Sequence, residues 1–332
     1  MGNLIDWNNI VSPGTAAAAD FGDPRREFDA VRSGAVVTPL RDFGLLRIHG
    51  DDAGTFLQGQ LTCDLDQVTA EQAQFGGYCT PKGRLLANFV LMAMPQGYLM
   101  CLPADVATSV ADRLRKFVLR SKVKIEREGG WHGLGLAGPA TASLLEQIGA
   151  APKRRLAVEA HASTRVIRLS SEIILLIASS VDMPVLWNSL AKSAIPAGTQ
   201  CWSWVQIQAG LPWITQATQD QFLPQMIGLD AIGGVSFEKG CYTGQEIVAR
   251  THYLGEVKRK LRMGSTRGGV KPGDALMANG EQCGTVLNAA QLPEGDRVLL
   301  AVVSEQATGE AMQTAGGESV DLSAPATLLM PG

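Results

Sequence analysis

The chain has 332 residues, of which 45% are hydrophobic and 18% are charged, and its net charge is −3 at pH 7. The length suits about two domains of ordinary size, and the composition argues against disordered, collagen-like and coiled-coil proteins. So small a net charge argues against attraction of the whole molecule to nucleic acid or to anionic lipid.

The N-terminal sequence and the apolar stretches bear on where the protein is located. Residues 1–23 contain acidic residues and an alanine run, without the basic and apolar regions of an export signal. The longest apolar stretches, 85–94 and 173–178, are about half as long as a bilayer-spanning helix. We therefore expect a cytoplasmic protein without a membrane segment.

The cysteines and histidines do not form a recognisable metal or disulfide pattern. Six cysteines are scattered without a C-x-x-C pair, which predicts neither a secreted disulfide framework nor a self-contained zinc or iron–sulfur site. The four histidines are too separated in the sequence to suggest a metal centre. We expect no permanently bound metal.

The first half of the chain predicts a strand–helix–strands–helix unit. A strand at 45–50 ends in glycine, and Asp51 or Asp52 can cap a helix that runs to residue 60. Strands at 75–80, 85–94 and 98–102 are separated by Pro-Lys-Gly and Pro-Gln-Gly turns. Apolar residues at steps of three and four then predict a helix with one buried stripe, formed by Val106, Val110, Leu114, Phe117 and Val118.

A shorter version of the same order follows, with strands at 133–137, 166–169 and 173–178 and helices at 140–148 and 185–191. We interpret the two segments as related units with mixed sheets. Residues 133–138 match G-x-G-x-x-G, but acidic residues precede them and Pro139 follows. A dinucleotide site needs an apolar strand before the glycines and a helix within them, so we expect a strand packed closely against a neighbour.

Beyond Gly255 the pattern changes to short segments punctuated by glycine and proline. Candidate strands lie at 259–263, 275–277, 284–287, 297–303 and 319–322, without long helices between them. This spacing predicts a small antiparallel barrel as a C-terminal domain.

The segment 234–250 is the strongest candidate for chemistry. A strand-like Val235–Phe237 leads into a glycine-flanked turn that carries Lys239 and Cys241, and Thr243 can cap a following helix with Glu246 three residues later. A neighbouring lysine and a helix N-terminus both favour a thiolate. The segment therefore predicts a reactive or ligating thiol, with a small buried cysteine in a turn as the alternative.

Two clusters of basic residues lie before and after this segment in the sequence. The first carries seven positive charges against two negative ones, and the second follows the cysteine segment. They consist of Arg113, Arg115, Lys116, Arg120, Lys122, Lys124 and Arg127, and of Arg250, Lys258, Arg259, Lys260 and Arg262. Such runs are usually solvated faces, but on one side of the molecule they would attract a polyglutamate tail, a phosphate-bearing ligand or RNA.

At residues 239–246, Lys-Gly-Cys-Tyr-Thr-Gly-Gln-Glu, the sequence resembles the YgfZ family of folate-binding proteins, which is linked to iron–sulfur cluster maintenance and tRNA modification. Further segments resemble the family in the same order and cover most of residues 45–262. They lie at 56–62, 78–84, 120–123, 210–212, 222–225 and 229–230. The wider superfamily is that of the glycine cleavage T-protein, an aminomethyltransferase that uses tetrahydrofolate.

The resemblance implies an α+β fold, a three-domain cloverleaf around a folate-sized central hole. Two ferredoxin-like mixed α/β units and a C-terminal small antiparallel β-barrel would form it. The implied division is 25–125 for the N-terminal folate-superfamily unit, 126–200 for the second unit, 201–255 for a motif segment that completes both around the cavity, and 256–332 for the barrel.

The chain departs from the T-protein pattern at the residues that carry out catalysis. By spacing from Gly83, Ala87 and Asn88 stand where T-proteins have paired aspartates, so neither can hold or deprotonate the transferring amine. Gln208 stands, by spacing, where a T-protein glutamate grips the pterin. Aminomethyltransferase activity is therefore not expected, and whether the chain is an enzyme stays open.

The resemblance implies a tetrahydrofolate-binding protein that acts in iron–sulfur cluster assembly or repair, with an indirect effect on tRNA modification. Cys241 would be the transient cluster ligand, redox thiol or nucleophile, and Lys239 would favour its thiolate. The implied folate-contacting residues are Tyr78, Asn88, Gln208, Gln225, Tyr242, Gln245, Glu246 and Arg250. The expected partners are folate and iron–sulfur assembly or client proteins, without stable nucleic-acid binding; a one-carbon transferase and a non-enzymatic scaffold are the alternatives.

Overall fold

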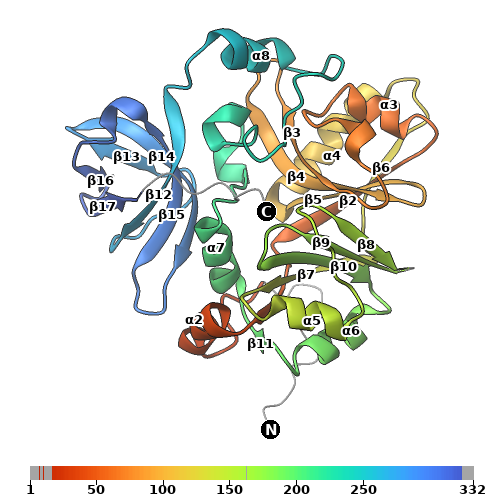
Figure 1. Ribbon diagram of the computed structural model, residues 1–332. Coiled ribbons are helices and arrows are strands. Elements are labelled where there is room, and N and C mark those ends of the chain that lie inside the picture. Colours follow the sequence, from red (N-terminus) through yellow and green to blue (C-terminus); the bar gives the residue numbers. More distant parts are fainter. Residues whose placement is uncertain (1–6, 8–9, 11–16, 162, 324–332) are drawn as a thin grey trace.

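The computed structural model describes residues 7, 10, 17–161 and 163–323 of the chain. Much of the segment 1–23, for which no export signal is expected, and the end of the predicted unit 256–332 lie outside these residues. Figure 1 shows three lobes, two formed by open sheets and one by a barrel, with helix α7 (Thr199–Gln208) between them. No helix in the described ranges is long and apolar enough to cross a bilayer.

The first lobe is a five-stranded antiparallel sheet in the order β3-β4-β5-β2-β6. Its strands are β2 (Phe43–His49), β3 (Gln74–Cys79), β4 (Leu85–Met94), β5 (Gly97–Pro103) and β6 (Lys124–Arg127), and its helices are α3 (Ala53–Gln58) and α4 (Ala104–Val118). Val106, Val110 and Leu114 of α4 are buried as predicted, but Phe117 is 44% exposed, so its place in the buried stripe was wrong. Phe117 lies in the last turn of α4, where its side chain extends into solvent.

The second lobe is a six-stranded sheet in the order β11-β1-β7-β10-β9-β8. It contains β1 (Val36–Pro39), β7 (Trp131–Ala137), β8 (Val158–His161), β9 (Thr164–Arg168), β10 (Ile173–Ser179) and β11 (Ile195–Pro196), with helices α5 (Thr141–Gln147) and α6 (Met183–Leu190). Strand β1 pairs antiparallel with β7 and parallel with β11. A strand that precedes the first sheet in sequence thus belongs to the second.

The glycine run at 133–138 lies on strand β7, as expected for a packing motif. A side chain at Gly135 would place its Cβ 2.5 Å from the ring of Trp202 on α7. No real Cβ contact is that short, so glycine is required for α7 to lie against the sheet. The run brings α7 to the centre of the molecule.

The third lobe is a closed barrel with the strand order β12-β15-β14-β13-β16-β17, which confirms the predicted C-terminal barrel. Its strands are β12 (Arg259–Thr266), β13 (Ala275–Ala278), β14 (Glu281–Gln291), β15 (Arg297–Ser304), β16 (Met312–Thr314) and β17 (Ser319–Leu322). The short strand β16 had no sequence signal of its own. Helix α8 (Gln245–Leu254) leads into the barrel, and α2 (Pro24–Ser33) packs beside α7.

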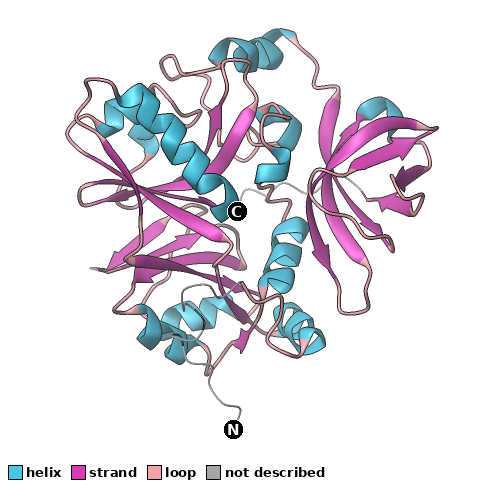
Figure 2. Ribbon diagram, turned by 180° about the vertical axis from the view of Figure 1, so that it is seen from behind, coloured by secondary structure: helices cyan, strands magenta, loops and turns pink. Residues whose placement is uncertain are grey.

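One continuous apolar core joins the lobes. It includes Val90 of the first sheet, Ile177 of the second, Trp202 of α7 and Leu300 of the barrel. Figure 2, seen from behind, shows the same three-lobed arrangement and the long helix α4 lying across the first sheet. Because buried apolar contact is the main source of stability, we expect the lobes to hold fixed positions around α7.

Candidate functional site

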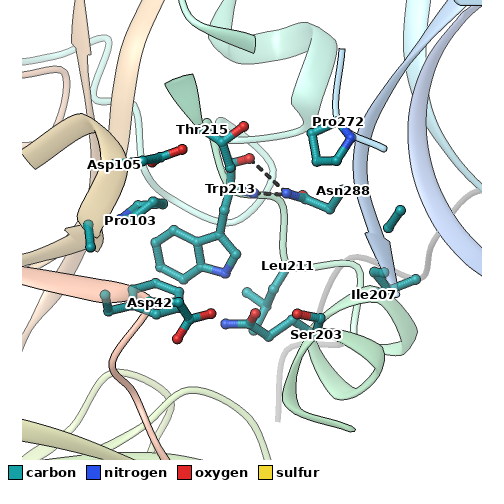
Figure 3. A pocket seen from close by; sticks show the side chains of 14 residues that line it. Asp42, Pro103, Asp105, Ser203, Ile207, Leu211, Trp213, Thr215, Pro272 and Asn288 are labelled. Carbon is teal, nitrogen blue, oxygen red and sulfur yellow. Dashed lines mark hydrogen bonds between the residues drawn. The ribbon is translucent and has the colours of Figure 1, made fainter. Parts of the chain in front are cut away.

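A cavity of about 350 Å³ lies where the first sheet, helices α4 and α7 and the barrel meet. Figure 3 shows its walls, which come from distant parts of the sequence. The lining residues are Asp42, Phe43, Pro103, Ala104, Asp105, Ser203, Gln206, Ile207, Leu211, Trp213, Thr215, Pro272, Asn288 and Ala289. We call it the central cavity.

An extended segment, 211–215, forms one wall and is held from both sides by asparagines. Asn88 of β4 donates from Nδ2 to the Pro212 carbonyl and accepts from the Ile214 N–H, each at 2.8 Å. Asn288 of β14 accepts from the Trp213 N–H and donates to the Trp213 carbonyl, each at 2.9 Å. Figure 3 shows the Asn288 bonds as dashed lines, with the Trp213 indole projecting into the cavity. The first sheet and the barrel together therefore fix this indole.

Asp42 supplies an incompletely satisfied carboxyl group to the cavity. It follows β1, and its Oδ1 is buried without a hydrogen-bond partner. Burial, opposed by a bond to its own backbone and helped by nearby Asp105, raises the pKa of Asp42 from 3.8 to about 6. An unpartnered buried acceptor calls for a ligand that donates hydrogen bonds.

Gln206 is the amide of α7 that lines the cavity, whereas the predicted Gln208 is exposed and lies outside the lining. In the amide orientation that satisfies both indoles, Gln206 Oε1 accepts from Trp213 Nε1 at 2.9 Å and from Trp202 Nε1 at 3.1 Å. Two residues along a helix correspond to a rotation of about 200°. The two-residue offset therefore turns Gln208 away from the cavity.

The loop 239–244, here called the Cys241 loop, is anchored by a buried lysine. Lys239 Nζ donates to the carbonyls of Gln58, Leu61 and Cys63 at 2.7, 2.8 and 2.8 Å. It also lies 5.4 Å from the centre of the Tyr242 ring, a distance suited to a cation–π contact. Three carbonyls and an aromatic face replace the water that this ammonium loses.

This arrangement changes the role expected for Lys239. Burial lowers the pKa of Lys239, while the Cys63 thiol and the carboxylates of Asp64 and Asp66 act in the opposite direction. The titratable groups that act on Lys239 are thus Cys63, Asp64 and Asp66, and Cys241 is not among them. The structure gives no contact through which Lys239 would favour the Cys241 thiolate.

Close backbone packing fixes the other end of the loop. A side chain at Gly244 would place its Cβ 2.4 Å from the Thr80 carbonyl and 2.9 Å from Gly83 Cα, and both glycines have positive φ angles of 84° and 72°. Only glycine tolerates this combination of conformation and approach. Two segments of the family resemblance, 78–84 and 239–246, are therefore in direct contact.

The structure corrects two local predictions here. Val235–Phe237 is not a strand but irregular backbone, held by hydrogen bonds from the Ser236 N–H to the Thr62 carbonyl and from Thr62 Oγ1 to the Gly234 carbonyl. Helix α8 begins at Gln245 with Gly244 as its N-cap, and no side chain caps it. Thr243 is therefore not the cap; the position is taken by a glycine in the left-handed conformation, with a φ of 84°.

Cys241 is exposed, whereas the other five cysteines are buried and all six are free. Burial raises the pKa of Cys63, Cys79, Cys101 and Cys201 to about 12. Such thiols stay protonated at neutral pH and react poorly. The sulfur that the sequence singled out is the one that solvent and partners can reach.

The remaining predicted residues divide between the loop and the protein interior. Gln225 is buried and donates to the Val248 carbonyl at 2.7 Å, while its Oε1 and the hydroxyl of buried Tyr242 have no partner. Gln245, Glu246 and Arg250 lie on α8, the last two exposed. Tyr78 is buried and bonds to the Arg113 side chain, a contact described further below.

The predicted residues thus do not form one site. Asn88 supports the wall of the central cavity, Gln208 lies outside its lining, and neither Cys241 nor Lys239 lines it. Tyr242 belongs to the Cys241 loop, and Gln225 binds the helix that follows the loop, whereas Tyr78 is buried in the core of the first lobe. Gln245, Glu246 and Arg250 lie on that following helix. Sequence reasoning missed Asp42, Gln206, Trp213 and Asn288. The one usable signal was a carboxylate, Asp42, in the short connection between two apolar segments. Within the described ranges, no group of three or more His, Cys, Asp or Glu is placed to hold a metal ion.

The chain has the fold of the glycine cleavage T-proteins. The GCVT N-terminal domain family matches residues 14–239. The glycine cleavage system aminomethyltransferase T of Bartonella henselae superposes with a TM-score of 0.75 at 17% identity, over 92% of this chain and 90% of that one. At this identity the likeness concerns the fold alone.

Relatives with similar sequences show to which family of this fold the chain belongs. The tRNA-modifying protein YgfZ of Escherichia fergusonii is 32% identical over 290 residues, which cover 85% of this chain and 89% of that protein. The proteins of the same name from Escherichia coli O7:K1 and Shigella boydii serotype 4 give the same values. The chain therefore belongs to the YgfZ family of the GCVT superfamily.

Proposed function

We propose that the protein binds a reduced folate in the central cavity and uses Cys241 in the maintenance of iron–sulfur clusters on which tRNA-modifying enzymes depend. The observation that carries the folate half is the unpartnered carboxyl oxygen of Asp42 beside the indole of Trp213. The cysteine half rests on the exposure of Cys241 in a loop that is anchored on both sides, at Lys239 and at Gly244.

The groups in the central cavity suit a pterin ring. The 2-amino group and the adjacent ring N–H of a pterin form a two-donor edge, which a carboxylate such as Asp42 can accept in bidentate fashion. The flat face of the ring suits stacking on the Trp213 indole. Asp42 and Trp213 would thus hold the ring, while Asn88 and Asn288 position Trp213 through its backbone.

Residues at the aspartate positions of T-proteins argue against aminomethyl transfer. Asn88 uses both ends of its amide on the 212–214 backbone, and Ala87 is fully buried. Neither can accept a proton from an amine. The folate would accordingly be bound rather than charged with a one-carbon unit at this position.

Cys241 would act as a passing thiolate ligand to an iron of a cluster that is cargo rather than a resident group. Ligation replaces the S–H bond with an Fe–S bond and releases the proton to solvent. Because the sulfur is exposed, a cluster bound to it can pass to another protein. Lys239 serves as a positioning residue that ties the loop to the turn after α3.

Calorimetric titration with 5-formyltetrahydrofolate tests the folate half. We expect Asp42→Asn to weaken binding by about tenfold or more, and Glu294→Gln, an exposed carboxylate on a barrel turn, to leave it unchanged. Because the pKa of Asp42 is about 6, affinity should fall as the pH drops through 6. Equal affinity of Asp42→Asn and the unmodified chain would refute the assignment.

Complementation tests the cysteine half. Cells that lack the native gene should recover cluster-dependent tRNA thiolation with the unmodified chain but not with Cys241→Ala. Cys283→Ala, a buried thiol of the barrel, is the control and should complement. Full activity of Cys241→Ala would remove the cysteine from the mechanism without touching the folate proposal.

A further inference from the structure

A second cavity, of about 340 Å³, lies along helix α4 on the side of the first sheet. Its lining residues are Leu86, Ser109, Val110, Asp112, Arg113, Lys116 and Gln219. Apolar side chains form the floor, and hydroxyl, amide and cationic groups form the rim. This mixture suits a ligand with both apolar and anionic parts.

The charge that this second cavity offers is positive. Asp112, its one carboxylate, is already bound by Arg115 at 2.6 Å. Arg113 and Lys116 have no carboxylate within ion-pair distance among the described residues. The Ser109 hydroxyl already donates to the Val106 carbonyl at 2.9 Å, so the two cations without counter-charges are the groups that make this a site for anions.

Arg113 is held in place rather than free to swing. Its side chain bonds to the hydroxyl of Tyr78, which is 1% exposed in the core of the first lobe. Its Nε is buried without an acceptor. The guanidinium is therefore positioned in advance, with hydrogen-bonding capacity that the protein does not use.

Helix α4 connects this cavity to the central one. Asp105 lines the central cavity, and Ser109, Asp112 and Lys116 line the second; steps of four, three and four place all of them on one helix face. At 1.5 Å per residue, Asp105 and Lys116 are about 16 Å apart along the axis. The segment 215–219 runs beside α4, with Thr215 in the first lining, Gln219 in the second, and the Gln216 N–H bonded to Asp105 at 2.9 Å. In Figure 2 the helix leads from the centre of the molecule outward.

We propose that the second cavity binds the carboxylates of a glutamate tail whose pterin lies in the central cavity. The inference rests on the proposed folate function and adds a preference for folates that carry several glutamates. The ligand's two ends match the two cavities: the pterin is a donor and needs Asp42, whereas the tail is an anion and needs Arg113 and Lys116. Each further glutamate adds one carboxylate for these cations.

Calorimetry with the full chain tests this assignment. The probes are 5-formyltetrahydrofolate with one and with three glutamates, each titrated into the unmodified chain, into Arg113→Gln/Lys116→Gln and into a matched control. The control, Arg120→Gln/Lys124→Gln, removes the same charge from exposed residues outside the cavity. Thermal melts should show all three proteins folded at the temperature of the titration, with Arg113→Gln/Lys116→Gln melting somewhat lower because it loses the bond to Tyr78.

We expect the triglutamate to bind the unmodified chain and the control about tenfold more tightly than the monoglutamate. In Arg113→Gln/Lys116→Gln this gain should disappear, so that the two folates bind this variant with equal affinity. The gain should also shrink as salt is added.

Two results would overturn the inference: a triglutamate that binds no more tightly than the monoglutamate, or a gain that survives in Arg113→Gln/Lys116→Gln. Loss of binding to a short RNA in that variant, without any gain from glutamates, would assign the cavity to phosphates instead and equally overturn it. Failure of both folates to bind any of the proteins is a different outcome, which refutes the proposed folate function itself.

Discussion

The central cavity and the Cys241 loop differ in how their residues are spread along the chain. The cavity takes its lining from residues between 42 and 289, on the first sheet, helices α4 and α7, the barrel and the loops between them. The loop has its sulfur and its lysine two residues apart, and its supports come from a few short segments of the first lobe. Function in the cavity therefore depends on how the lobes are placed, whereas function in the loop depends on local geometry.

The two regions also differ in what their buried polar groups do. Lys239 is buried with three hydrogen-bond acceptors and stabilises the folded protein. Asp42 is buried with an unsatisfied oxygen and destabilises it. A buried polar group without a partner in the protein can form its hydrogen bond with a ligand instead. Substitutions at these residues should consequently change stability in opposite directions.

The largest effect is expected at Lys239. Lys239→Met leaves three backbone carbonyls without a donor, so the free energy of unfolding in urea should fall by about 3 kcal/mol or more. Lys258→Met, an exposed control, should change it by less than about 0.5 kcal/mol. Equal stability of both variants would show that the lysine does not anchor the loop.

A gain in stability is expected at Asp42. Because its pKa is raised to about 6, the folded protein keeps a proton that the unfolded chain releases, and stability falls as the pH rises from about 4 to 6. Asp42→Asn removes this penalty and should raise the free energy of unfolding at pH 7 by up to about 3 kcal/mol. The difference should vanish near pH 4, and a variant that is less stable at pH 7 would contradict this account.

The two asparagines offer a graded test of the cavity wall. Asn88→Ala removes two buried bonds to the 212–214 backbone and should cost about 2 kcal/mol in urea denaturation. Asn288→Ala removes two partly buried bonds to Trp213 and should cost about 1 kcal/mol. Both should weaken folate binding; unchanged affinity in both would show that the position of Trp213 does not matter to the ligand.

The smallest effect on stability is expected at Cys241. Cys241→Ser changes an exposed side chain and should alter the free energy of unfolding by less than about 0.5 kcal/mol. Thiol titration of the native unmodified chain should show one fast-reacting cysteine out of six, and Cys241→Ser should show none. A fast thiol that persists in the variant would mean that another cysteine is accessible.

Local patterns in the sequence predicted most of the regular structure. Strands β2, β4 and β5, helix α4 and the barrel were each indicated by periodicity and turn residues close to where they lie. The errors arose where backbone is fixed by distant partners: Val235–Phe237 is held by Thr62, and the start of α8 is set by Gly244 against Thr80. The division of the chain at 125, 200 and 255 stays a prediction.

By itself the sequence determined the family and the barrel and singled out Cys241 among six cysteines, because each of these rests on patterns among neighbouring residues; that Cys241 is exposed came from the structure. Only the tertiary structure decided that Lys239 serves the backbone rather than Cys241, that Gln206 rather than Gln208 lines the cavity, and that Asp42 lies beside it. The physical reason is that a side chain's partners and its burial are set by segments far away in the chain, and these decide whether a charge is satisfied, exposed or left for a ligand.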